Sequence, residues 1–184
     1  TKATMNTIII LMIIMYFFGG LFTFIEENFK LFLTLSLRKY KVKGAVVDAI
    51  NINEEELNEA KKRATELNVN VNYVKADAGK LPFPDSSFDV ILDAGCTHMC
   101  DRETQEKSVL EATRLLKTGG YLQYFGFSKE HPGYQRNPNS PQFRDIEDIR
   151  KQYGEYFEIG EPKRKEWEHN GEKHIGLEIL MKKK

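Results

Sequence analysis

The sequence predicts an α/β fold built on a doubly wound, mostly parallel sheet that ends in an antiparallel β-hairpin. From residue 45 to the C-terminus, short apolar runs alternate with charged, helix-forming stretches, and this alternation is typical of parallel sheets. The last two apolar runs flank Asn170-Gly171, a dipeptide typical of a tight hairpin turn. The chain has 184 residues, enough for one domain with a substantial core.

Composition narrows the class of protein. Lysine plus arginine and aspartate plus glutamate both number 27, so the formal net charge is zero, and we expect no nucleic-acid partner. Cys96 and Cys100 are the two cysteines, four positions apart, which argues against a disulfide framework and favours a cytoplasmic location. The sequence gives no indication of the oligomeric state. Because it begins with Thr1 rather than Met, we expect a fragment or a trimmed chain.

Residues 7–25 carry no charge, and three interpretations of this segment stay open. It is long enough for a membrane anchor, with the following domain on the cytoplasmic side. It also fits a buried strand at residues 8–15, a turn at Gly19-Gly20 and a helix at residues 21–39, which is the interpretation we prefer. The third is an out-of-frame or mis-joined start. We therefore divide the chain into residues 1–43, an apolar N-terminal segment, and residues 44–184, the main domain.

The main domain predicts its elements in order. Residues 45–47 form a short apolar strand that ends at Asp48, and Asn53 then caps a helix that runs to about residue 67 with an acidic first turn. Residues 69–74 and 88–92 predict two further strands, separated by a loop at 76–85. The C-terminal half predicts helices at 103–116 and 146–153, a strand at 121–127, a loop at 131–141 and the hairpin strands 161–168 and 174–181.

Polar residues follow three of these strands. In doubly wound sheets, ligands bind outside the carboxyl ends of the strands. Asp48 could accept both hydrogen bonds of a ribose diol there, or it could merely cap the strand end. Asp77 could accept from an adenine amino group, while Ala78 leaves room for the ring. Together they favour a nucleotide-like ligand.

The order and spacing of three segments resemble a known family. VVDAIN, ADAGKLPFPDSSFDVILDAG and LLKTGGYLQYF are similar to the ribose-binding, adenine-side, fourth-strand and Lys-x-Gly-Gly segments of class I S-adenosylmethionine-dependent methyltransferases. The resemblance covers residues 44–184. A GC-x-H stretch at 95–98 and a His-Pro-Gly loop at 131–133 resemble the small-molecule branch of that family, such as thiopurine- or tellurite-type enzymes.

The resemblance implies a Rossmann-like fold, S-adenosylmethionine as cofactor and a small-molecule methyl acceptor. His98 is the candidate general base, with a structural or substrate-lining role as the alternative. Cys96, His98 and Cys100 alternate too closely for a usual zinc site, so we expect no metal. The cofactor-binding residues that the resemblance implies are Gly19, Gly20, Asp48, Ala49, Ile50, Asp77, Ala78, Asp93, Ala94 and Gly95.

The sequence departs from the family at its first turn. The family needs small residues there, whereas this chain offers Tyr16, Phe17 and Phe18 before Gly19-Gly20. The interval from Gly20 to Asp48 is also longer than the roughly 20 residues of comparable folds. Bulky rings at this place would obstruct the cofactor. The alternative function is therefore a catalytically inactive binding or structural domain, tethered to a membrane if residues 7–25 form an anchor.

Overall fold

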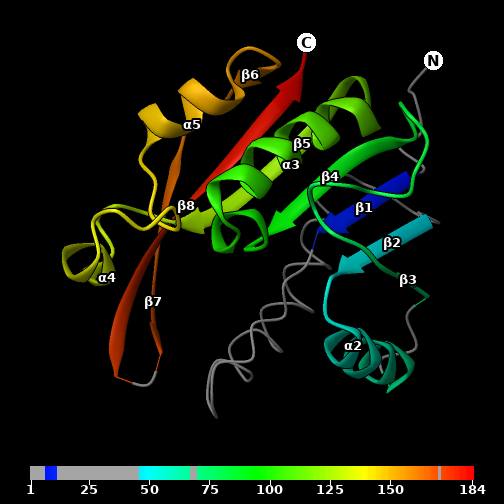
Figure 1. The fold of residues 1–184 in the computed structure, drawn as a ribbon, viewed down its shortest axis with the longest axis horizontal. Coiled ribbons are helices and arrows are strands. Elements are labelled where there is room, and N and C mark those ends of the chain that lie inside the picture. The colour runs from blue at the N-terminus through cyan, green and yellow to red at the C-terminus, as the bar shows by residue number, and fades with distance from the viewer. Residues whose placement is uncertain (1–6, 12–45, 67–69, 170) are drawn as a thin grey trace.

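Strands of the N-terminal and C-terminal halves join in one sheet. The computed structural model describes residues 7–11, 46–66, 70–169 and 171–184, and its strands follow the order β3-β2-β1-β4-β5-β8-β6, with β7 also paired to β8 (Figure 1). The strands are β1 (Thr7–Leu11), β2 (Val46–Asn51), β3 (Asn72–Lys75), β4 (Phe88–Ala94), β5 (Leu116–Phe127), β6 (Phe157–Ile159), β7 (Lys163–His169) and β8 (Glu172–Lys183). The helical elements are α2 (Glu54–Glu66), η1 (Thr97–Met99), α3 (Arg102–Leu115), α4 (Pro132–Arg136) and α5 (Ile146–Tyr153).

The predicted fold class is confirmed. Strands β3, β2, β1, β4 and β5 run parallel to their neighbours, and β8 runs antiparallel to β5, β6 and β7. The hairpin of β7 and β8 turns at Gly171, whose φ of +74° is readily adopted only by glycine. An otherwise parallel sheet thus closes with an antiparallel edge.

The apolar start of the chain contributes the central strand β1. This strand lies between β2 and β4, with Ile9 opposite both Asp48 and Ile91. The predicted turn at Gly19 and Gly20 and the helix after it lie outside the described residues, as does most of the segment for which an anchor was considered. Within the described part of the chain, no helix combines the length and the apolar character that crossing a membrane requires.

The helices begin where side chains cap them. Asn53 Oδ1 accepts from Glu55 N and Glu56 N at the start of α2, and Asp101 Oδ1 accepts from Thr104 N at the start of α3. Asp145 and Asp148 form a reciprocal capping box on α5. These bonds satisfy backbone donors that the first turn of a helix leaves without partners.

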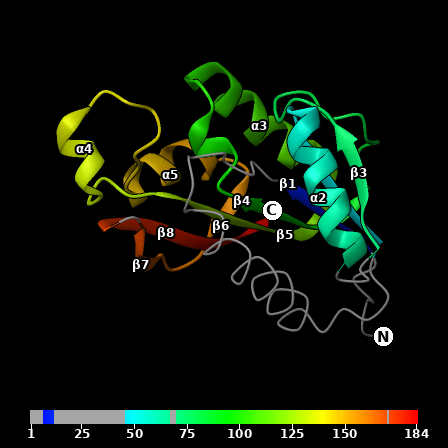
Figure 2. The same cartoon turned by 90° about the horizontal axis from the view of Figure 1, so that it is seen from below.

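The core lies between the sheet and the helices α3 and α5, which cover the same face of it (Figure 2). The buried positions of α3 recur at helical spacing, and Ile149 and Tyr153 are the buried positions of α5. The largest fully buried side chains are Tyr124, Tyr153, Phe88, Phe157, Ile91, Leu92, Leu115, Leu116 and Ile149.

One predicted strand boundary is wrong. Strand β2 does not end at Asp48 but continues to Asn51, because Ala49, Ile50 and Asn51 pair with β3 at Tyr73, Val74 and Lys75. The sequence also did not predict the edge strand β6 or the single-turn helix α4. Long-range pairing, which a local pattern does not contain, sets the end of β2.

Candidate functional site

A cavity of about 230 Å³ lies at the carboxyl ends of β2, β3 and β4. This is the edge at which doubly wound sheets bind ligands. The walls come from the end of β2, the turn after β3, the turn after β4 and the first turn of α3. The lining residues are Ile50, Asn51, Ile52, Ala76, Asp77, Ala78, Cys96, Cys100, Asp101 and Thr104.

Asn51, rather than Asp48, reaches this cavity from β2. Asn51 is the last residue of the strand and is buried, and its Oδ1 accepts from Asn53 N at 2.9 Å. Its Nδ2 donates to Glu56 Oε2 at 2.6 Å. Asp48 lies three residues earlier, inside the strand, where its Oδ1 accepts from Asn72 Nδ2 at 2.6 Å, and it is not among the lining residues. The polar group at the end of β2 is therefore an amide.

Burial raises the pKa of the Glu56 carboxyl group, and the hydrogen bond from Asn51 opposes part of this rise. Glu56 is 7% exposed. The amide of Asn51 therefore does two things: it faces the cavity, and it supplies a donor to a buried carboxylate behind it.

Asp77 and Ala78 form the turn after β3 and line the cavity, as the sequence predicts. Asp77 is exposed, and its Oδ1 accepts from Gly79 N at 2.7 Å. Lys80 N donates to the carbonyl oxygen of Asp77 at 2.9 Å. Ala76 and Ala78 present only methyl groups. The turn thus combines a carboxylate that accepts hydrogen bonds with space for a flat group.

Arg114 holds the loop that follows this turn. Its Nη1 donates to Phe83 O and Asp85 Oδ1, both at 2.7 Å, and its Nη2 donates to Leu81 O at 3.0 Å and to Glu111 Oε2 at 2.8 Å. Glu111 Oε2 also accepts from Leu81 N at 2.7 Å. A pair of charges on α3 therefore fixes both the donor and the acceptors of the loop at 81–85.

Arg114→Ala is expected to lower the free energy of unfolding by about 1.5 kcal/mol, because it leaves two loop carbonyl groups and the Glu111 carboxylate without this donor. Urea denaturation followed by circular dichroism measures the change. The matched control is Arg150→Ala, which removes an exposed pair with Glu147 and should cost less than about 0.5 kcal/mol. Equal losses in the two variants would contradict the role of Arg114.

Asp93 organises the turn after β4 rather than lining the cavity. It is 2% exposed; its Oδ1 accepts from Cys96 N at 2.9 Å and Thr97 N at 3.2 Å, and its Oδ2 accepts from Thr97 Oγ1. Burial raises the pKa of the Asp93 carboxyl group, and these three hydrogen bonds oppose the rise. Between Asp93 and Cys96, Gly95 turns the chain with a φ of +86°.

His98 is buried behind this turn. It is 3% exposed, and neither ring nitrogen has a hydrogen-bond partner among the described residues. Its ring meets Phe127 edge to face, with centroids 4.8 Å apart. Burial, followed by the positive charge of Arg144, lowers the pKa of His98 to about 3. The imidazole is therefore neutral at pH 7.

The loop after β5 is held against the hairpin of β7 and β8. His131 Nδ1 accepts from Gly133 N at 2.9 Å, so Nε2 carries the proton in the neutral ring and donates to His174 Nδ1 at 2.9 Å. Burial, and then His174, lowers the pKa of His131 to about 4. His174 in turn stacks on Trp167 with centroids 5.4 Å apart. These contacts fix an aromatic layer next to His98.

Cys96 and Cys100 both line the cavity as free thiols, and Cys100 Sγ donates to Cys96 O at 3.6 Å. Within the described ranges, no three His, Cys, Asp or Glu side chains converge in a way that could hold a metal ion.

The predicted site residues thus fall into three groups. Ile50, Asp77 and Ala78 line the cavity, whereas Asp48, Ala49, Asp93, Ala94, Gly95 and His98 do not; Gly19 and Gly20 lie outside the described residues. Reasoning from sequence missed Asn51, Ile52, Ala76, Cys100, Asp101 and Thr104. For Asn51 a signal exists, because it is the last polar residue before the Asn53 cap of the next helix.

Known proteins similar to this chain are methyltransferases. The family model described as "Methyltransferase domain" matches residues 32–123, half of the chain. A ubiquinone/menaquinone biosynthesis C-methyltransferase of Rickettsia massiliae is 42% identical over 87 residues, which cover 46% of this chain and 34% of the relative. The corresponding protein of Pasteurella multocida is 40% identical over 89 residues, 47% of this chain and 32% of the relative. The chain therefore spans about a third of the length of these relatives.

Solved structures share the fold. A SAM-dependent methyltransferase from Methanosarcina mazei superimposes with a TM-score of 0.69 at 23% identity, over 98% of this chain and 93% of that one. A SAM-dependent methyltransferase from Aquifex aeolicus gives a TM-score of 0.64 at 20% identity, over 95% of this chain and 81% of the other.

Proposed function

The chain belongs to the class I S-adenosylmethionine-dependent methyltransferase family, and from this we propose that it transfers the methyl group of S-adenosylmethionine to a small-molecule acceptor. One observation carries the proposal: the cavity lies at the carboxyl ends of β2, β3 and β4, and its walls suit a nucleoside. When bound, the cofactor supplies an electrophilic methyl group on a sulfonium.

The lining residues fit the adenosine part of this cofactor. Ala76 and Ala78 leave space for a purine ring, and the Asp77 carboxylate beside them can accept from its amino group. At the end of β2, Asn51 can hydrogen-bond to ribose hydroxyl groups. The Asp48 carboxylate, which the sequence suggested for that role, is already bonded to Asn72 inside the strand. We therefore propose Asn51 as the ribose ligand in its place.

We propose that His98 contacts the acceptor as a neutral group rather than acting as a strong general base. A pKa of about 3 leaves the imidazole unprotonated at pH 7 but gives it little driving force to remove a proton. Methyl transfer needs a base only when the nucleophile must lose a proton, so alignment of the acceptor is the larger task of the protein.

We also propose that residues 1–43 complete the domain and that the protein acts in the cytoplasm without a nucleic-acid partner. The position of β1 between β2 and β4 supports the first point, and the two free thiols support the second. The balanced charge supports the third.

Isothermal titration with S-adenosylhomocysteine, the demethylated product, tests the proposal. Asn51→Ala is expected to weaken binding about 10-fold, because it removes a polar partner of the ligand at the cavity wall. Asp48→Ala should leave the dissociation constant within about 2-fold of wild type, since Asp48 bonds to Asn72 rather than to the ligand.

The two variants and the wild type separate the alternatives. Weakening by Asp48→Ala but not by Asn51→Ala would overturn the ribose assignment. Binding in the wild type without turnover across a panel of small acceptors would favour the inactive binding domain. A folded wild-type protein that does not bind would refute the proposed function.

A further inference from the structure

Four buried polar atoms have no hydrogen-bond partner among the described residues: His98 Nδ1, His98 Nε2, Tyr124 Oη and Arg144 Nη2. They come from the turn after β4, from β5 and from the loop before α5, so elements distant in sequence bring them into one region of the core. An unpaired buried polar atom costs roughly 1–3 kcal/mol. Four in one region need a common explanation, and a missing partner supplies one.

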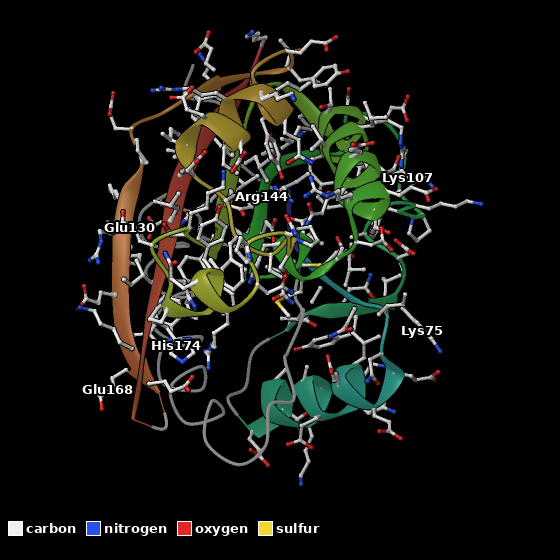
Figure 3. All side chains as sticks on the ribbon, turned by 60° about the vertical axis from the view of Figure 1, so that its left-hand side comes forward. Lys75, Lys107, Glu130, Arg144, Glu168 and His174 are labelled. Carbon is white, nitrogen blue, oxygen red and sulfur yellow. The ribbon has the colours of Figure 1, made fainter. Side chains whose placement is uncertain are left out.

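Arg144 is the centre of this group, which we call the Arg144 cluster (Arg144, Tyr124 and His98). Its side chain is 5% exposed and lies in the interior of the molecule, whereas Lys75, Lys107 and Glu168 lie at the periphery (Figure 3). The backbone at Arg144 is fixed by a hydrogen bond from Arg144 N to Phe127 O at 3.0 Å. The guanidinium is therefore held in place from the backbone outward.

The charge of Arg144 has no carboxylate partner within 4.0 Å among the described residues. Its Nη1 donates to the neutral Gln152 Oε1 at 2.7 Å. The nearby Asp93 is already bonded to Cys96 N, Thr97 N and Thr97 Oγ1. A guanidinium this deeply buried is normally paired with an anion, because removal of a charge from water is costly.

Tyr124 and His98 lie beside this charge. The Tyr124 ring has its centroid 5.8 Å from Arg144 Cζ. A Cβ atom added at Gly126 would collide with Tyr124 Oη and would lie 3.0 Å from His98 Cβ, so the two side chains flank the same glycine. The positive charge of Arg144 also contributes to the lowered pKa of His98. The three groups therefore share one local environment.

The donors in the Arg144 cluster define what can complete it. Arg144 Nη2 can only donate, Tyr124 Oη can donate or accept, and a neutral imidazole offers one donor and one acceptor. A ligand group that accepts several hydrogen bonds and carries negative charge satisfies them together. Next to it, the ring of Phe127 packs against both His98 and Phe143, whose ring is nearly parallel to that of Phe127 with centroids 6.0 Å apart. That layer suits a planar ligand.

We propose that the methyl acceptor is a planar small molecule with an anionic oxygen group, a carboxylate or phenolate, and that the Arg144 cluster binds this group. The inference rests on the proposed function for the word acceptor, but the anion site can be tested without it. The four atoms are shielded from solvent, so the ligand enters when the loop of residues 128–145, which carries Arg144, moves aside.

Thermal unfolding with benzoate and benzamide tests the site. The two molecules have the same ring, but only benzoate is charged. At equal ionic strength, millimolar benzoate is expected to raise Tm in the wild type, and benzamide is not. Arg144→Met should reduce the benzoate response at least about 10-fold in apparent affinity, and Tyr124→Phe should reduce it less. Arg150→Met, an exposed arginine on α5, should keep the full response.

Each outcome bears on the inference. Equal stabilisation by benzoate and benzamide, no response of the wild type to benzoate, or a full response in Arg144→Met overturns it. If Arg144→Met does not fold, Arg144→Lys and Tyr124→Phe serve in its place, and an unchanged response in both overturns the inference. Because these measurements need no S-adenosylhomocysteine, failure of the anion site and failure of cofactor binding are read separately.

Discussion

Thr104→Trp is expected to weaken the binding of S-adenosylhomocysteine by about 100-fold, or ~2.7 kcal/mol. Thr104 lies in the first turn of α3, half-buried, and its side chain forms part of the cavity wall. An indole ring at this position fills space that the ligand needs. The capping bond that begins α3 runs from Thr104 N to Asp101 Oδ1, so it involves the backbone and survives the substitution. Isothermal titration measures the change in dissociation constant.

Glu106→Trp is the matched control. Glu106 lies on the same helix but is exposed and outside the cavity lining, so an indole there should leave the dissociation constant unchanged. Both variants should melt near the wild-type temperature, since neither position is deeply buried. Wild-type affinity in a folded Thr104→Trp protein would show that the cofactor binds elsewhere.

Acidification from pH 7.5 to pH 4.5 is expected to cost the protein roughly 2–3 kcal/mol of unfolding free energy through His98 alone. The folded-state pKa is about 3, against a model value of 6.5. Between these values the unfolded chain binds a proton that the folded chain does not, so stability falls as the pH drops below 6.5. Each pH unit in this interval is worth about 1.36 kcal/mol, and pH 4.5 lies two units below 6.5.

His98→Gln isolates this contribution. Glutamine is polar but does not titrate, so the variant should keep the pH dependence of all other groups and lose the part due to His98. The measurement is a series of urea unfolding curves at both pH values for the two proteins. If the difference between pH 7.5 and pH 4.5 is the same in both, His98 is not buried in a neutral state as described.

The sheet and the turn after β3 could be predicted from the sequence because each depends on a local pattern. The Asn53 cap, the acidic first turn of α2 and the hairpin turn at Gly171 are all local signals, and each appears in the structure. Asp77 and Ala78 were found for the same reason, since the turn follows its strand directly.

The ribose side of the site could not be predicted in this way. The end of β2 depends on its pairing with β3, and three more paired residues moved the cavity-facing position from Asp48 to Asn51. An acidic residue near a strand end attracts attention in a sequence, but here it bonds to Asn72 on the neighbouring strand. The side-chain period of two within a strand makes such small shifts important.

The Arg144 cluster also lies beyond reasoning from sequence. Arg144, Tyr124 and His98 are separated in the chain, and no spacing rule joins them. In a sequence, Arg144 is one more arginine near the start of a helix, where a solvated side chain is the usual expectation. Only the fold shows that it is buried without a carboxylate partner.

The central position of β1 has a consequence for how the chain reaches its native state. The first strand to leave the ribosome pairs with β2 on one side and with β4, some 80 residues later, on the other. Without it, no strand pairing would connect the β2–β3 block to the block of β4, β5 and β8. Closure between distant segments slows folding, so we expect a collapsed intermediate in which the two blocks form before they join. Stopped-flow refolding would show it as a fast phase that precedes recovery of the full β-sheet signal.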